Sequence, residues 1–136
     1  MKIITNKDFL HKPCLYIENI EWNNLRLKLL VAINERKNNA SGIALNQIGI
    51  NKRGFVIRIN NKMLFFKNPK IKLNGTIIKH SEKCFSLKKE YKVERYNEVI
   101  INDDINGSLK FTGYNAFVIQ HEFDHLQGIL IKDKEL

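Results

Sequence analysis

Two histidines and a glutamate near the carboxyl end of the chain have types and spacing that suit metal chemistry. The segment 120–125 reads Gln-His-Glu-Phe-Asp-His. Residues four apart lie on one face of a helix, so His121 and His125 can direct both imidazoles to one metal ion. Glu122 would lie beside the ion, where its carboxylate can hold and deprotonate a water molecule. The segment predicts a hydrolytic metal site, although two surface histidines and a chance glutamate would give the same pattern.

The residues before this pattern have helical spacing. Apolar positions recur at i, i+3, i+4 and i+7 in Tyr114, Phe117, Val118 and His121. Gly113 suits the start of such a helix and Gly128 suits its stop. The sequence therefore predicts a helix that carries the histidines.

Two histidines leave the coordination of a metal incomplete, and segment 80–89 offers two further candidates. Cys84 can supply a thiolate, which suits Zn or Fe and offsets the charge of the cation. His80 is the competing candidate. Farther upstream, Gln47 is a polar residue in the small, apolar segment 40–50, which is either a loop entering a strand or a backbone edge that approaches a ligand. In the second interpretation the Gln47 side-chain N–H faces a ligand oxygen.

The remaining elements predict one α+β domain over residues 1–136, with small antiparallel sheets around the metal-binding helix and one additional N-terminal helix. The expected helix covers 21–38. The expected strands cover 55–59, 63–66, 70–73, 76–78, 93–95, 99–101, 109–111 and 129–131, with turns at 60–61, 74–75 and 106–107.

Composition limits the compartment and the partners. The N-terminus has no signal-peptide pattern, no apolar run is long enough to span a membrane, and two cysteines are too few for a disulfide framework. We therefore expect a cytoplasmic protein without membrane contact, and we also expect a monomer. The formal charge of +9 comes from scattered lysines, which predicts no specific nucleic-acid recognition and at most a weak association with RNA or the ribosome.

Three segments together resemble the peptide deformylases. That family has a motif Gly-x-Gly-x-Ala-Ala-x-Gln, which residues 40–47 match, a motif Glu-Gly-Cys-Leu-Ser, which residues 82–86 match, and a motif Gln-His-Glu-x-Asp-His, which residues 120–125 match. The order of the motifs is also similar, and the resemblance covers roughly residues 20 to 131. The chain departs from the family at Ala40, Leu45, Lys83 and Phe85. At position 83 the family motif has glycine, and the lysine found here allows fewer backbone conformations than glycine would.

The resemblance implies a reaction, the removal of the formyl group from the N-terminal formylmethionine of new polypeptides. It implies that Cys84, His121 and His125 bind Fe(II), with Zn, Ni or Co able to replace it. Glu122 would take a proton from water and pass it to the leaving amine. The Gln47 side chain and the Phe85 backbone N–H would stabilise the oxyanion.

The resemblance also implies where the substrate lies. Backbone groups of Gly42 and Ile43 would pair with the N-formylmethionyl peptide as an added strand. Tyr114, Phe117 and Val118 would line the methionine pocket, and Glu82 is grouped with these substrate-facing residues. The expected supporting residues are Ser86, Arg95 and Asp124, with Arg95 holding Asp124 or Glu82.

Two other functions stay open at this point. A zinc endopeptidase could use the same helix, with Asp133 or Glu135 as its third ligand. A basic RNA- or ribosome-binding protein could retain the fold without activity. A short chain of this kind resembles forms from bacteria, from viruses that infect them, or from organelles.

Overall fold

The computed structural model describes residues 1–36 and 39–136, and this part of the chain forms an α+β fold with two three-stranded antiparallel sheets. The helices are α1 (Lys7–Leu10), α2 (Asn19–Glu35) and α3 (Tyr114–Leu126), with 3-10 helices at Leu45–Ile48 and Ile131–Lys134. One sheet has the order β1-β2-β3, from β1 (Gly42–Ala44), β2 (Gly54–Ile59) and β3 (Lys62–Lys67). The other has the order β4-β5-β6, from β4 (Lys70–Glu82), β5 (Tyr91–Asp103) and β6 (Gly107–Thr112). The predicted fold class is confirmed.

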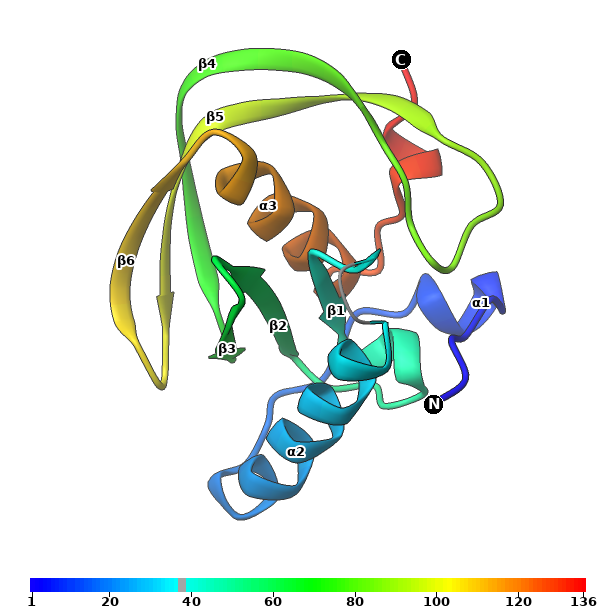
Figure 1. Cartoon of the computed structure of the whole chain (residues 1–136), viewed down its shortest axis with the longest axis vertical. Coiled ribbons are helices and arrows are strands. Elements are labelled where there is room, and N and C mark those ends of the chain that lie inside the picture. The colour runs from blue at the N-terminus through cyan, green and yellow to red at the C-terminus, as the bar shows by residue number, and fades with distance from the viewer. Residues whose placement is uncertain (37–38) are drawn as a thin grey trace.

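Helix α3 lies between the two sheets, with β4 and β5 arching over it, as Figure 1 shows. The alternation of side chains along β2 explains this arrangement. Phe55 and Ile57 belong to the buried cluster that includes Ala116 of α3. Val56, between them, belongs to the cluster that includes Leu29 of α2. One short sheet thus supports the central helix on one face and the N-terminal helix on the other.

Helix α2 begins two residues before the predicted start. The backbone N–H of Glu18 donates to the Glu21 carboxylate at 2.9 Å, and an acidic side chain in the first turn suits the positive end of the helix dipole. The buried face consists of Trp22, Leu25, Leu29, Ala32 and Ile33. The predicted end, at 37–38, lies outside the described residues.

The two predicted hairpin turns are confirmed, but three local predictions are wrong. Residues 74–75 do not form a turn, because β4 continues through them with a bulge that places Gly75 at φ 81°. Segments 93–95 and 99–101 form one strand, β5. The predicted strand 129–131 does not form, because the Leu130 N–H donates to the Asp133 side chain at 2.8 Å and the chain enters a 3-10 helix.

Candidate metal centre

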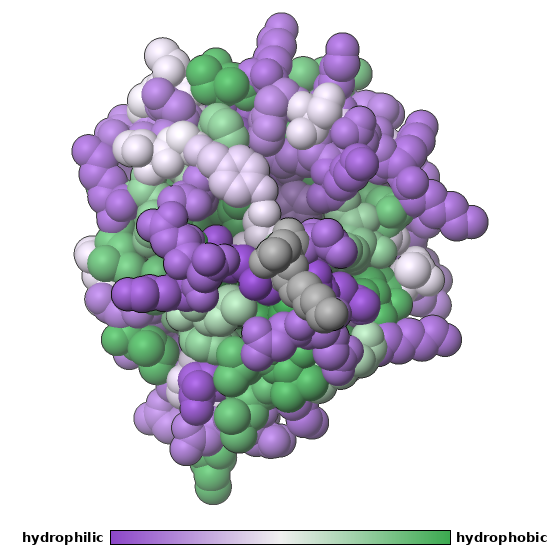
Figure 2. Space-filling model, viewed as in Figure 1, coloured by the Kyte–Doolittle hydropathy of each residue, from purple (hydrophilic) through white to green (hydrophobic). Residues whose placement is uncertain are grey.

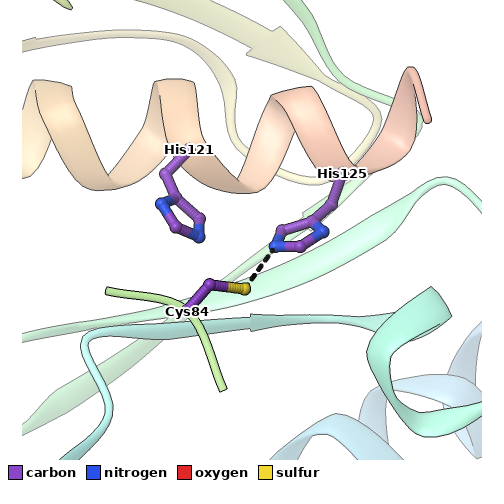
Figure 3. A group of neighbouring side chains, drawn as sticks. All are labelled: Cys84, His121 and His125. Carbon is purple, nitrogen blue, oxygen red and sulfur yellow. Dashed lines mark hydrogen bonds between the residues drawn. The ribbon is translucent and has the colours of Figure 1, made fainter. Parts of the chain in front are cut away.

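The three candidate ligands come from two separate parts of the fold. Helix α3 starts just after Gly113 and ends two residues before Gly128, close to the predicted limits, and its inner face carries His121 and His125. Their ring centroids are 5.1 Å apart. Cys84 lies two residues after the end of β4 and directs its sulfur toward both rings, as Figure 3 shows. One ligand atom from each residue lies within 4.8 Å of the others.

The donor set fits a divalent metal. Ligand atoms around a tetrahedral ion with one thiolate and two imidazoles are about 3.5 Å apart, and the distance from Cys84 Sγ to His125 Nε2 is 3.4 Å. A thiolate with two imidazoles suits Zn or Fe. Among the described residues, the buried Oε1 of Glu122 has no hydrogen-bond partner. A buried carboxylate oxygen without a partner fits a site that holds a further polar group.

A buried network of ion pairs orients His121. The Arg95 guanidinium donates to both oxygens of Glu82, at 2.9 and 2.8 Å, and to Asp124 at 2.5 Å. Glu82 Oε1 in turn lies 2.9 Å from Nδ1 of His121. An imidazole whose Nδ1 is bound to a carboxylate presents Nε2 to a metal, because the partner fixes the tautomer and the ring orientation. The predicted contacts of Arg95 with Asp124 and Glu82 are thus present.

Burial and neighbouring charges shift the pKa values of three groups at the site. Burial raises the pKa of Glu122 to about 7, which is the range in which a general base exchanges protons near neutral pH. Burial, aided by the charge of His121, lowers the pKa of His125 well below its usual value and favours the neutral, metal-binding form. Burial also acts to lower the pKa of His121, but Cys84 and Glu82 outweigh it and raise this pKa.

Gln47 lies in the 3-10 helix after β1 and is buried. Its Oε1 accepts the Ala44 N–H at 3.0 Å, which orients the amide. Its Nε2 then faces the site, 3.5 Å from Cys84 Sγ and 3.3 Å from Ser86 Oγ. The side-chain N–H groups of Gln47 are therefore directed at Cys84 and Ser86, beside the candidate metal ligands.

A cleft of about 530 Å³ opens at this site. Five of the six predicted substrate residues line it, namely Gly42, Glu82, Tyr114, Phe117 and Val118, and Phe85 lines it as well. Ile43 does not, because its side chain is fully buried in the cluster around α2. A Cβ on Gly42 would lie 2.9 Å from Oε2 of Glu122, so glycine lets this strand approach the carboxylate closely. The backbone of Lys83, a departure from the family motif, does not have positive φ and needs no glycine.

The structure also shows contacts that sequence patterns did not predict. His80 is not part of the ligand group; its ring packs on Phe117, with centroids 4.5 Å apart, and its Nε2 lies 2.7 Å from Glu82. Ser41 and Tyr114 hydrogen-bond through their hydroxyls beside the cleft. Because side chains alternate along a strand, His80 and Glu82 lie on the same face of β4. The sequence contains this spacing, but it is informative only when residues 70–82 are known to form one continuous strand.

The endopeptidase alternative requires a ligand from the end of the chain. Asp133 instead lies 3.0 Å from Nε2 of His11 and accepts the Leu130 N–H. In the described residues, no helix is long and apolar enough to cross a membrane.

Two histidines and a glutamate of one helix lie beside a cysteine in this α+β fold. This arrangement defines a metal-dependent hydrolase. The chain belongs to the polypeptide deformylase family, whose sequence profile matches residues 1–135. It removes the N-formyl group from formylmethionine at the N-terminus of new polypeptides and releases formate. Neither the endopeptidase nor the non-catalytic alternative is supported.

Relatives and solved structures agree on this family. Peptide deformylase 1 of Clostridium perfringens is 37% identical over 139 residues, which cover 95% of this chain and 92% of that protein. The actinonin-bound peptide deformylase of Acinetobacter baumannii is 26% identical with a TM-score of 0.88, covering 100% of this chain and 98% of that one. The Thermotoga maritima enzyme is 27% identical with a TM-score of 0.85, covering 99% and 97%.

Proposed function

We propose that Cys84, His121 and His125 hold the metal and that Glu122 carries the proton in deformylation. The observation that carries this proposal is the meeting of three ligand atoms within 4.8 Å, beside a buried carboxylate. When bound, a divalent metal supplies Lewis acidity that activates water and polarises the formyl carbonyl. Glu122 Oε1 has no other partner in the described residues, so it can accept a proton from water and release it to the methionine amine.

Gln47 and the backbone N–H of Phe85 are the proposed donors to the oxyanion. The Ala44 N–H fixes the Gln47 amide in advance, so its Nε2 needs no reorganisation when charge develops on the formyl oxygen. One lost donor of this kind typically costs ~3 kcal/mol of transition-state stabilisation. Ser86, buried and 3.3 Å from Gln47 Nε2, supports this orientation.

The edge of β1 is the proposed docking strand for the formylmethionyl peptide. In the described sheet, β1 pairs only with β2, so backbone groups of Gly42 and Ile43 are available for an added strand. Tyr114, Phe117 and Val118 line the cleft from one face of α3 and would contact the methionine side chain. Since the Acinetobacter relative was solved with actinonin bound, we expect actinonin to compete with substrate in this cleft.

The metal, the partners and the compartment complete the proposal. Fe(II) is the expected native ion, with Zn, Ni or Co able to occupy the same ligands, and Arg95, Glu82 and Asp124 keep His121 oriented. Glu82 is also predicted to face the substrate, although both its oxygens already have partners. Residues 1–136 would act as one cytoplasmic, monomeric catalytic domain, with weak ribosome association arising from its charge of +9.

Formate release tests the proposal. Protein purified without oxygen and loaded with Fe(II), Zn, Ni or Co is assayed on a formyl-Met peptide, with an internal peptide bond substrate as the control. We expect formate from the first, no cleavage of the second and inhibition by actinonin. Turnover that is unchanged in a Cys84→Ala variant with no bound metal would contradict the ligand assignment.

A further inference from the structure

A second hollow of about 480 Å³ adjoins the catalytic cleft. Four residues of the loop between β4 and β5 line both spaces, namely Phe85, Leu87, Lys88 and Lys89. Residues near both ends of the chain, including Lys7 and Lys132, also line the second hollow. The two spaces therefore adjoin each other along this loop, and we refer to them together as the basic path.

This path has an excess of positive charge. Lys7, Lys83, Lys88, Lys89 and Lys132 line it and are all exposed. In residues 1–36 and 39–136, none of these ammonium groups forms an ion pair with a carboxylate of the chain.

One of these lysines also has a defined position. Lys89 Nζ lies 5.1 Å from the ring centroid of the buried Tyr91, so its ammonium is held over the aromatic face. Among the lining residues, Glu90 is the exposed carboxylate that opposes this charge, since Glu82 and Glu122 are buried in the site. Figure 2 shows hydrophilic side chains projecting from the upper part of the molecule, where β4 and β5 lie in Figure 1.

We propose that this basic path, defined by Lys7, Lys83, Lys88, Lys89 and Lys132, binds acidic side chains of the nascent peptide downstream of formylmethionine. The inference rests on the proposed function, because the peptide enters with its formyl end at the metal and its following residues must leave along the cleft. A concave surface lined with one sign of charge concentrates ligands of the opposite sign. An acidic peptide fits this better than RNA does, because the lysines line the catalytic cleft itself and the hollow that shares the β4–β5 loop with it.

Matched substrates test the preference. Formyl-Met peptides with an Asp-Glu pair at positions 3–4 or 5–6 are compared with peptides that have Asn-Gln there. At low salt we expect kcat/KM to be about fivefold higher for an acidic peptide, as two exposed ion pairs would give. At 0.5 M salt the ratio should fall toward one, because screening weakens exposed pairs.

Two variants with the same change in net charge locate the effect. Lys88→Glu with Lys89→Glu should bring the ratio below one. Lys28→Glu with Lys62→Glu should keep it, because these exposed lysines of α2 and β3 line neither space.

Three outcomes would overturn the inference. The first is a ratio near one at low salt for both placements, with good turnover of the neutral peptide, which leaves the proposed function intact. The second is an equal loss of preference in both double variants, which would make the effect one of net charge. The third is a Lys88→Glu, Lys89→Glu variant that keeps the preference for acidic peptides but no longer co-sediments with ribosomes, which would make the path an RNA surface. Absence of formate from every peptide would instead refute the proposed function, and this inference with it.

Discussion

At the scale of single residues, the arrangement of the site depends on one buried guanidinium. Arg95 donates to Glu82 and Asp124, and Glu82 holds His121. Burial acts to raise the pKa of Glu82, but the hydrogen bonds from Arg95 and His121 outweigh it and hold this pKa well below its usual range. Glu82 therefore stays charged in the folded protein because Arg95 and His121 are its partners.

Replacing Arg95 with Leu should destabilise the fold by about 3–5 kcal/mol at pH 7, because two buried carboxylates lose their partner. Since the folded-state pKa of Glu82 is lowered, its stabilisation is present above the unfolded pKa of about 4.3 and is lost as the pH falls toward the folded value. The difference between wild type and variant should therefore narrow below about pH 4. Urea unfolding at pH 7 and pH 3.5 measures it.

An exposed pair provides the control for this change. Lys110, 3.1 Å from Glu98, has a side chain that is 60% exposed. Lys110→Leu should cost less than about 1 kcal/mol at either pH. An Arg95 variant that is as stable as the Lys110 variant at pH 7 would show that the buried network of ion pairs does not stabilise the fold.

Glu122→Gln should lower kcat/KM by about 10²–10⁴, the usual contribution of a general base, with little change in bound metal. The amide keeps the size of the side chain but cannot take a proton. Formate release and metal analysis on the same sample separate the two effects. Glu94→Gln, at an exposed position of β5, is the matched control and should keep full activity; a fully active Glu122 variant would show that another group moves the proton.

At the scale of elements, the sequence predicts what short-range patterns determine. The spacing of the histidines on α3 and the hairpin turn at 60–61 are local properties, and both are confirmed. Gly75 shows the limit, because an Asn-Gly pair signals a turn but the pairing of β4 with β5 makes it a bulge. There Thr76 donates its N–H to the Asn97 side chain across the sheet at 2.9 Å, a partner 21 residues away.

The candidate site, like the fold, was predicted only in part from the sequence. Resemblance to the family identified Cys84 as the companion of the two histidines, and the structure brings the three together. The packing of His80 on Phe117 and the second hollow beside Lys88 depend on how β4, β5 and the two chain ends meet. No spacing within a single segment encodes such a meeting.

The close approach of β1 to α3 gives a prediction at this scale. In Gly42→Ala the new methyl group would meet Glu122 Oε2 at 2.9 Å and the Val56 carbonyl oxygen at 3.0 Å. Because Glu122 must move, we expect kcat/KM to fall at least about tenfold, since small displacements at a catalytic group have large effects on rate. Steady-state kinetics and thermal melting on one preparation measure activity and stability together.

Gly107→Ala is the comparison for this variant. Gly107 has φ 68° at the start of β6, and a Cβ there would meet nothing within 4 Å. Its substitution should cost about 1 kcal/mol of stability through backbone strain and leave activity unchanged. If the two variants lose activity equally, crowding of Glu122 is not the cause.

At the scale of the whole molecule, the metal ligands join parts of the fold that share little core. Cys84 belongs to a small buried cluster with Tyr91, Val93 and Ile131, whereas His125 is on α3, which packs in a separate cluster with residues of β2, β3 and β5. A metal bound by both would link the β4–β5 loop to the central helix. Binding to the folded state alone stabilises it by about 4 kcal/mol at a metal concentration a thousandfold above Kd.

Removal of the metal should therefore lower the melting temperature of the whole chain by roughly 10–15 °C, since 1 kcal/mol corresponds to about 3–4 °C for a domain of this size. Calorimetry with and without a chelator measures the shift. Cys84→Ala should melt lower and show little further shift with chelator. Cys14→Ala is the matched control, because Cys14 is a buried thiol whose pKa burial raises to about 11 and which packs in the cluster around α3. It should lose stability through its cavity yet keep the full chelator-dependent shift, and a shift that survives in the Cys84 variant would show that the metal is held elsewhere.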